Sequence, residues 1–229
     1  METVLVACQT ISDEVERALS ATGRSLPVRW IESGLHVRPD ALRVRLQQDL
    51  DALSGVDRVL LAFGYCGNAL VGLTAGAFRL TFPRADDCIT LMLGSCERRR
   101  EIQSEAGTYF LTHGWLTHEA NVWAEYNATV AKRGKERADR VYATMLKHYR
   151  RLGVIDTGAY DMAGFMERSK TVASDLRLEH FVIDGTTAWL ERLVSGPWDD
   201  GFVTFEPHET VTVERLFGPG PAPPPTLQS

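Results

Sequence analysis

The sequence predicts an α/β fold in which a mostly parallel sheet carries helices on both faces, giving three layers. Short apolar runs typical of buried parallel strands alternate along the chain with segments of helical periodicity. The composition, with 44% hydrophobic and 24% charged residues among 229, is that of an ordinary globular protein. A chain of this length can bury a single core, so we expect one domain over residues 1–217. Residues 218–229 are rich in Pro and Gly and are expected to form a disordered tail.

The N-terminal part of the chain gives the clearest strand and helix signals. Residues 56–63 form a nearly continuous apolar run, which is typical of a buried parallel strand. Leu42, Leu46 and Leu50 recur with helical spacing, which predicts a helix with one buried face. A further helix is expected to begin near Ala69. The predicted strands are residues 3–7, 27–31, 56–63 and 78–82, and the helices between them are residues 12–21 and 39–54.

The rest of the chain continues this pattern around a helical insertion at residues 118–150. The insertion is expected to contain two helices separated by Gly134, and its dense charge is typical of a solvated face. The insertion is either a lid over a site or a packing arm for a second subunit, so both a monomer and an oligomer are compatible with the sequence. Asp86 or Asp87 is expected to cap a short helix that ends at Gly94. Further helices are predicted at 97–105, 160–175 and 186–194, and strands or extended segments at 107–115, 153–156, 181–184 and 202–205.

The charge and the apolar runs exclude several classes of protein. The net charge of −5 argues against general binding to nucleic acid or to an anionic membrane, because both favour a basic protein. No apolar run approaches the ~18–20 residues of a membrane helix. The N-terminus lacks the basic segment and apolar stretch of a signal peptide. We therefore expect a cytoplasmic protein that acts on a small-molecule substrate.

Three of the four cysteines follow predicted strands. Cys8, Cys66 and Cys88 come after the first, third and fourth strands, and sites in open α/β sheets form outside the carboxyl ends of the strands. Each cysteine alone is more often a small buried apolar residue. Together, the three thiols would suit a tetrahedral zinc site with one open position. They would also suit a [4Fe–4S] cluster with one iron open to substrate.

Polar and glycine residues beside these thiols are further candidates. Gly64 and Gly67 flank Cys66, and together with Asn68 they are expected to form a sharp turn that exposes the Cys66 sulfur to a cofactor. The helix expected near Ala69 would place this thiol before a helix N-terminus, where negative charge is stabilised.

Three residues are candidates for handling the substrate. Arg84, at a strand end, could hold a carboxylate or phosphate. His36 is a candidate acid or base in a loop, and His113 lies in an aromatic cluster with Tyr109 and Trp115. Neither GxGxxG nor a P-loop occurs, so a dinucleotide or P-loop nucleotide is not indicated.

Taken together, these motifs resemble the DUF1638 family, a bacterial and archaeal domain of unknown function. The resemblance covers nearly the whole chain except the tail. Two departures stand out: Asp86 occupies a position that is usually His, which weakens a ligand role there, and Cys96 falls outside the pattern and is left out of the expected site. The matching elements are Ala7-Cys8, Leu35-His36, Gly64–Asn68, Gly72-Leu73, Pro83–Ile89, Leu93–Ser95, Gly107–Thr112, Gly114-Trp115 and Gly196–Phe202.

Three functions follow as hypotheses. The first is a metalloenzyme in which zinc held by the three cysteines activates a thiol for alkyl or methyl transfer, with His36, Arg84 or His113 handling the substrate. The second is a lyase or dehydratase whose [4Fe–4S] cluster acts as a Lewis acid. The third is a carrier or accessory protein for a metal or a corrinoid, without turnover. Family members in anaerobes often accompany corrinoid methyltransferase systems, so the resemblance implies such a system as a partner.

Overall fold

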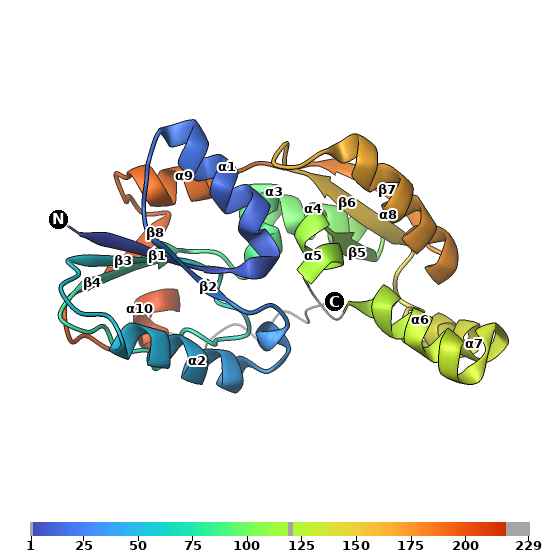
Figure 1. The fold of residues 1–229 in the computed structure, drawn as a ribbon, viewed down its shortest axis with the longest axis horizontal. Helices are drawn as coiled ribbons and strands as arrows, with labels where there is room; N and C mark the ends of the chain where they lie inside the picture. Colours follow the sequence, from blue (N-terminus) through green and yellow to red (C-terminus); the bar gives the residue numbers. More distant parts are fainter. Residues whose placement is uncertain (1, 119–120, 219–229) are drawn as a thin grey trace.

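The computed structural model describes residues 2–118 and 121–218 and confirms the α/β class (Figure 1). Within these residues the strands form two sheets, a division that the strand pattern alone does not indicate. Residues 219–229, most of the predicted disordered tail, lie outside the described residues. No helix in the described part of the chain combines the length and apolar composition needed to cross a bilayer.

The first sheet has the strand order β2-β1-β3-β4-β8. Its first four strands are parallel, and β8 pairs antiparallel with β4. Side chains of β1 alternate between the two faces, and because both faces are buried the strand is apolar throughout. The strands are β1 Thr3–Cys8, β2 Val28–Ile31, β3 Arg58–Ala62, β4 Arg79–Pro83 and β8 Phe202–Phe205.

Helices cover both faces of this sheet, as predicted. The helix α2 (Pro39–Asp51) buries Leu42, Leu46 and Leu50 against one face, which is the helical stripe read from the sequence, and α10 (Val213–Phe217) packs beside it. The other face is covered by α1, α3 and α9. These three helices span Ser12–Thr22, Cys88–Leu93 and Ala188–Ser195.

The second sheet is entirely parallel and has the order β5-β6-β7. One face contributes Phe110, Ile155 and Ile183 to the same hydrophobic cluster as α1, α3 and α9, so these helices lie between the two sheets. The opposite face packs against α8 (Met162–Leu176) and the helical insertion. The strands are β5 Thr108–Leu111, β6 Arg151–Asp156 and β7 Glu179–Asp184.

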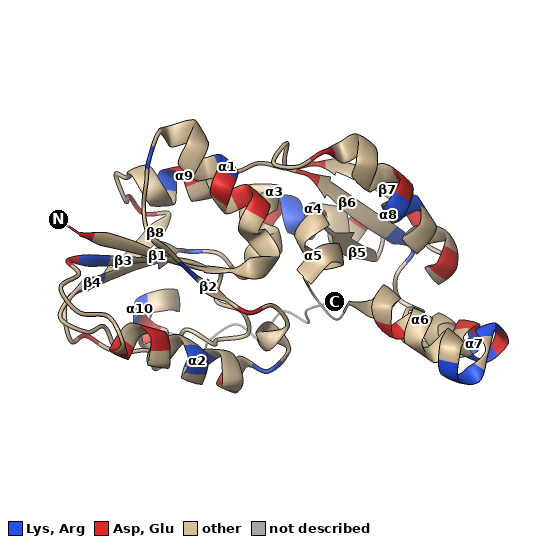
Figure 2. Ribbon diagram, in the orientation of Figure 1, with Lys and Arg blue, Asp and Glu red and all other residues tan. Residues whose placement is uncertain are grey.

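The insertion is a pair of helices, as predicted. The helix α6 (Val122–Arg133) and the helix α7 (Lys135–Met145) meet at Gly134, whose φ of 80° suits glycine. The pair projects from the second sheet (Figure 1) and carries residues of both charge signs (Figure 2). Its exposed ion pairs include Arg140 with Glu136, which agrees with a solvated face.

Short helices follow the carboxyl ends of three strands: the 3₁₀ helices η1 (Gln9–Ile11) after β1 and η2 (Leu35–Val37) after β2, and α5 (His113–His118) after β5. The longer helix α4 (Cys96–Glu105) follows α3 and leads into β5. The expectation for residues 107–115 therefore resolves into β5 followed by α5. The caps predicted for α3 are confirmed, since the Asp87 carboxylate accepts from the Thr90 N–H and Gly94 ends the helix in the left-handed region.

The helix predicted near Ala69 is absent from the described residues. Residues 66–72 form successive turns instead, closed by bonds such as Ala69 N–H to the Tyr65 carbonyl at 2.9 Å. Cys66, Gly67 and Asn68 adopt φ values of 46°, 65° and 69°. A right-handed helix cannot begin through a left-handed segment, so no helix N-terminus follows Cys66.

Candidate functional site

One pocket lies between the carboxyl ends of the two sheets, the location expected for a site in an α/β protein. Residues following β2, β4 and β5 meet there, so the pocket is built from both sheets. Cys88 and His36 both line it, and we call it the thiol pocket. Its lining residues are His36, Asp87, Cys88, Ile89, Arg99, Phe110 and Trp115.

The floor of the thiol pocket is fixed by the buried carboxylate of Asp87. This carboxylate accepts from the Thr90 N–H at 2.9 Å and from the Thr90 hydroxyl at 3.0 Å, which caps α3. Its second oxygen lies 2.7 Å from Arg99 Nη1, and the two side chains are only 4% and 13% exposed. The ion pair joins α3 to α4 and holds Cys88, the first residue of α3, in the pocket wall.

His36 reaches the pocket from η2. Its ring meets the Trp115 indole edge to face, with centroids 6.4 Å apart and an interplanar angle of 80°. Burial lowers the pKa of His36 below its ordinary value, and the nearby Asp87 charge opposes this only in part. The imidazole is therefore mainly neutral at pH 7 and able to accept a proton.

Cys8 is the last residue of β1 and is not among the residues that line the thiol pocket. Its sulfur is 3.1 Å from the Thr10 hydroxyl, and its side chain packs against the hydrophobic clusters on both sides of the first sheet. The next turn is held against α5, because a Cβ at Gly114 would lie 2.0 Å from the Thr10 carbonyl oxygen. Glycine at this position lets α5 approach closely and bring Trp115 to the pocket.

Cys66 lies elsewhere. Its side chain is 2% exposed and belongs to the cluster on the α2 side of the sheet, so the expectation that the flanking glycines expose this sulfur is wrong. Gly64 instead lets the loop lie against the backbone of Asp87, and Gly67 packs beside Pro39. The turn at residues 64–68, which was predicted to bind a cofactor, instead packs between the segment after β4 and the start of α2.

The three predicted metal ligands do not meet at one point. Cys66 packs in one cluster, Cys88 packs against the other, and Cys8 contacts both. Within 2–118 and 121–218, no group of three or more Cys, His, Asp or Glu side chains is arranged to hold a metal ion. Zinc or an iron–sulfur cluster would need such a group. The described donors do not fit the expected three-cysteine site, so we derive no chemical step through either cofactor.

Asp86 and Cys96 form a separate group near Cys66. The Cys66 N–H donates to the Asp86 carbonyl at 2.9 Å. Burial raises the pKa of the Cys96 thiol, and the Asp86 carboxylate raises it further. Cys96, which the sequence pattern left out, therefore lies close to the residues around Cys66.

The Arg84 guanidinium binds a backbone carbonyl of the protein. Its Nη1 donates to the Leu216 carbonyl at 2.9 Å and so connects the end of β4 to α10.

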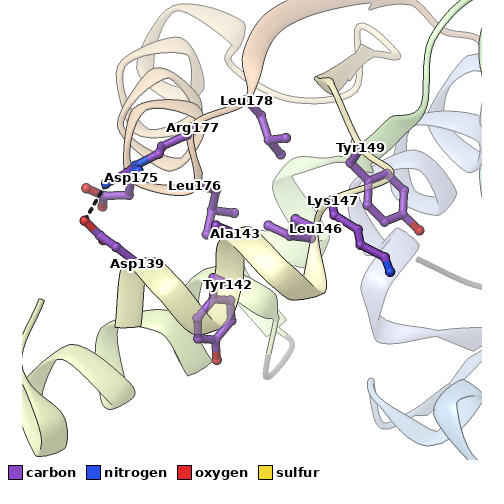
Figure 3. Close-up of a pocket in the computed structure, with 10 residues that line it drawn as sticks. All are labelled: Asp139, Tyr142, Ala143, Leu146, Lys147, Tyr149, Asp175, Leu176, Arg177 and Leu178. Atoms are coloured by element: carbon purple, nitrogen blue, oxygen red, sulfur yellow. Dashed lines mark hydrogen bonds and ion pairs between the residues drawn. The ribbon is translucent and has the colours of Figure 1, made fainter. Parts of the chain in front are cut away.

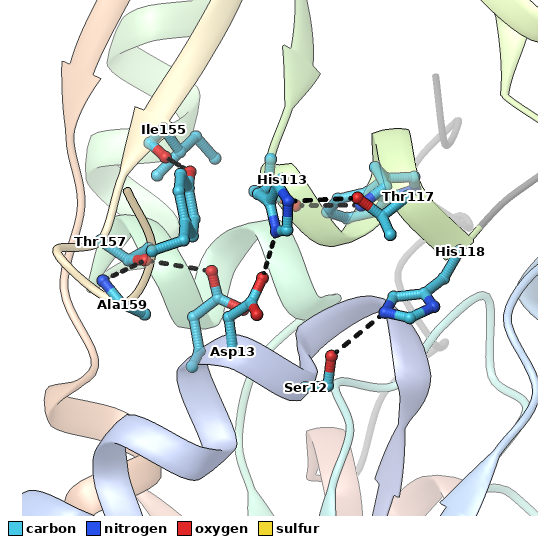
Figure 4. A network of polar contacts seen from close by, with 12 residues as sticks. Ser12, Asp13, His113, Thr117, His118, Ile155, Thr157 and Ala159 are labelled. Atoms are coloured by element: carbon cyan, nitrogen blue, oxygen red, sulfur yellow. Dashed lines mark hydrogen bonds and ion pairs between the residues drawn. The ribbon is translucent and has the colours of Figure 1, made fainter. Parts of the chain in front are cut away.

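His113 lies in a different cavity from His36. Its Nδ1 is 2.7 Å from Asp13 Oδ2 and its Nε2 is 3.3 Å from the Thr117 hydroxyl (Figure 4). The ring contacts Tyr160 and Phe165, with centroids 5.4 and 5.8 Å away. His36 and His113 therefore serve different parts of the molecule, although both had been expected at one site. The cavity is lined by Asp13, His113, Tyr160, Asp161, Gly164, Phe165 and Arg168.

A third cavity lies between α7 and the end of α8 (Figure 3). Arg177 spans it at one side, with its Nη2 2.8 Å from Asp139 Oδ2. Leu146, Leu176 and Leu178 supply apolar lining. The ion pair and these leucines account for the docking of the helical insertion on the second sheet.

The comparison with protein families agrees with the resemblance seen in the sequence. The model of DUF1638, described as a protein of unknown function, matches residues 30–194. The chain belongs to the DUF1638 family. Every lining residue of the thiol pocket falls inside the matched segment, whereas Cys8 precedes it. No curated protein and no solved structure matched the chain.

Arg99 and Trp115 line the thiol pocket but were not predicted from the sequence to act there. Arg99 belongs to a run of three arginines that differ only in the direction each faces on α4, so no signal in the sequence distinguishes it. Trp115 was placed in an aromatic cluster with His113, but helix α5 turns the two side chains toward different cavities.

Proposed function

We propose that this protein is an enzyme that uses the Cys88 thiol as a nucleophile on a small substrate bound in the thiol pocket. The observation that carries the proposal is that a half-buried thiol and a neutral, half-buried imidazole line one pocket at the carboxyl ends of the strands. A thiol paired with a base is a recurring arrangement for covalent catalysis.

The chemistry follows from the two groups. His36 accepts the proton of the Cys88 thiol, and the resulting thiolate attacks an electrophilic carbon of the substrate. A sulfur–carbon bond forms, and the leaving group departs with the electron pair of the bond that breaks. Alkyl and methyl groups are suitable electrophiles, which is consistent with the corrinoid systems implied by the family resemblance.

The walls of the pocket favour an anionic substrate. Arg99 has five N–H donors, and its contact with Asp87 leaves others to bind a carboxylate or phosphate. Trp115 and Phe110 supply an apolar surface for the rest of a small molecule. No disulfide joins the four cysteines, all of which lie in the described part of the chain, and this supports an action in the reducing environment of the cytoplasm.

Alkylation of the individual cysteines tests the proposal. We expect iodoacetamide to modify Cys88 first at pH 7, as followed by mass spectrometry of peptides from the folded protein. The variant His36→Gln removes the base, so the rate at Cys88 is expected to fall on the order of tenfold or more. The quantity measured is the alkylation rate at Cys88 in the native protein divided by the rate in His36→Gln. This ratio is close to one if the imidazole does not act on the thiol.

Cys96 is the matched control because it is, like Cys88, half-buried and outside any disulfide. Burial and Asp86 raise its pKa, so it is expected to react slowly and to be unaffected by His36→Gln. Equal rates at Cys88 and Cys96 in the native protein, or an equal effect of His36→Gln on both, would contradict the proposal.

A further inference from the structure

Three consecutive residues at the start of α1 contact three different groups around the second sheet, and Figure 4 labels two of the three, Ser12 and Asp13. Ser12 Oγ lies 3.4 Å from His118 Nε2, and Asp13 Oδ2 lies 2.7 Å from His113 Nδ1. Glu14 Oε1 accepts a hydrogen bond from the Thr157 hydroxyl at 3.0 Å. We call Ser12, Asp13 and Glu14 the α1 latch, because they join α1 to α5 and to the loop after β6.

Glu14 is the unusual member of the latch. The residue is 0% exposed, and its second oxygen, Oε2, has no hydrogen-bond partner among the described residues. Burial raises the pKa of Glu14 to about 7, and the Asp13 carboxylate adds to this. The carboxyl group is therefore accommodated as the neutral acid and becomes a poorly compensated buried charge when it ionises.

The ionisable groups around Glu14 come from three elements. Asp13 lies on α1 itself, and Arg17, one turn on, approaches the loop at Gly158. The loop contributes Tyr160, which interacts electrostatically with Glu14 and with Asp156 at the end of β6. From α5, His113 is held by Asp13 and His118 by Ser12. The anionic Asp13 carboxylate opposes a negative charge at Glu14.

We propose that the α1 latch is pH-sensitive: it holds α5 and the loop at residues 157–161 against α1 while Glu14 is neutral, and it loosens when Glu14 ionises. The device is independent of the thiol chemistry proposed above. It does lie next to that site, because α5 also carries Trp115, a wall of the thiol pocket.

The direction of the effect follows from proton linkage. The folded pKa of Glu14, about 7, is above the ordinary value of 4.5. Its contribution to stability is therefore fully present below pH 4.5 and is lost as the pH rises through about 7, because the unfolded or open chain releases the proton more easily. The difference corresponds to a change on the order of 10²-fold in the latch equilibrium.

Hydrogen exchange at pH 5.5 and pH 8 tests this inference, with rates corrected for the intrinsic effect of pH. In the native protein, amides of residues 113–118 and 157–161 are expected to lose protection at pH 8 on the order of 30-fold, because pH 5.5 already lies above the ordinary pKa of 4.5. Glu14→Gln keeps an acceptor for Thr157 but cannot ionise, so its protection is expected to be nearly equal at the two pH values. Glu16→Gln is the matched control, since Glu16 is an exposed carboxylate on the same helix, and it should behave as the native protein does.

Two outcomes overturn the inference. One is unchanged protection of both segments in the native protein between pH 5.5 and pH 8. The other is the same loss in Glu14→Gln as in the native protein, which would assign the effect to His113 or His118. If Glu14→Gln does not fold, Thr157→Val gives a second measurement: loss of the hydroxyl donor is expected to move the midpoint of the transition to higher pH, and an unmoved midpoint contradicts the latch.

Discussion

Replacing Gly64 with alanine is expected to destabilise the fold by about 3 kcal/mol or more, the upper range for overpacking in a close-packed interior. A Cβ at this position would lie 2.4 Å from Asp87 Cα, 2.5 Å from Asp87 N and 2.6 Å from Asp87 C. All three atoms belong to the backbone, so no side chain can rotate away to make room. Chemical denaturation followed by circular dichroism measures the loss.

The same substitution should also disturb the thiol pocket, because the backbone of Asp87 positions Cys88. Gly23→Ala is the control: Gly23 has a φ of 63° but no atom within 4 Å of a Cβ, so alanine there adds only the cost of a left-handed residue, about 1–2 kcal/mol. A Gly64→Ala variant as stable as Gly23→Ala would show that the two segments do not approach as closely as described.

The strands could be predicted from the sequence because burial on both faces leaves a continuous apolar run. Residues of β1 and β3 are apolar on each face, and both strands were found. The division into two sheets could not be predicted, because the partner of a strand is set by contacts distant along the chain. Strand β4 pairs with β8, with Leu80 opposite Phe205, and no local pattern marks that pairing.

The candidate site was predicted in part for a similar reason. Cys88 and His36 were placed near strand ends, and the structure brings both to one pocket. Cys66 also follows a strand, but its thiol turns into the core because the segment from Cys66 to Asn68 is left-handed. A position at a strand end therefore indicates the region of a site, whereas backbone geometry decides which face each side chain takes.

Replacing Arg99 with methionine is expected to cost about 3–5 kcal/mol, because it leaves the Asp87 carboxylate buried without its cation. The Asp87 and Arg99 side chains are 4% and 13% exposed and lie 2.7 Å apart. Methionine retains much of the apolar length of arginine, so the loss measured by denaturation reports mainly the charge. The buried location makes this effect much larger than that of a surface ion pair.

A double-mutant cycle separates the ion pair from other effects of the substitution. Asp87→Asn can still cap Thr90 but removes the charge, so Arg99→Met should cost less in that background by about 0.5–3 kcal/mol. Arg43→Met is the control, because Arg43 and Asp40 are 2.6 Å apart but 38% and 89% exposed, and its cost is expected to stay below about 1 kcal/mol. Equal costs at Arg99 and Arg43 would mean that solvent already screens Asp87, and Arg99 could then leave the carboxylate to bind an anionic substrate without loss of stability.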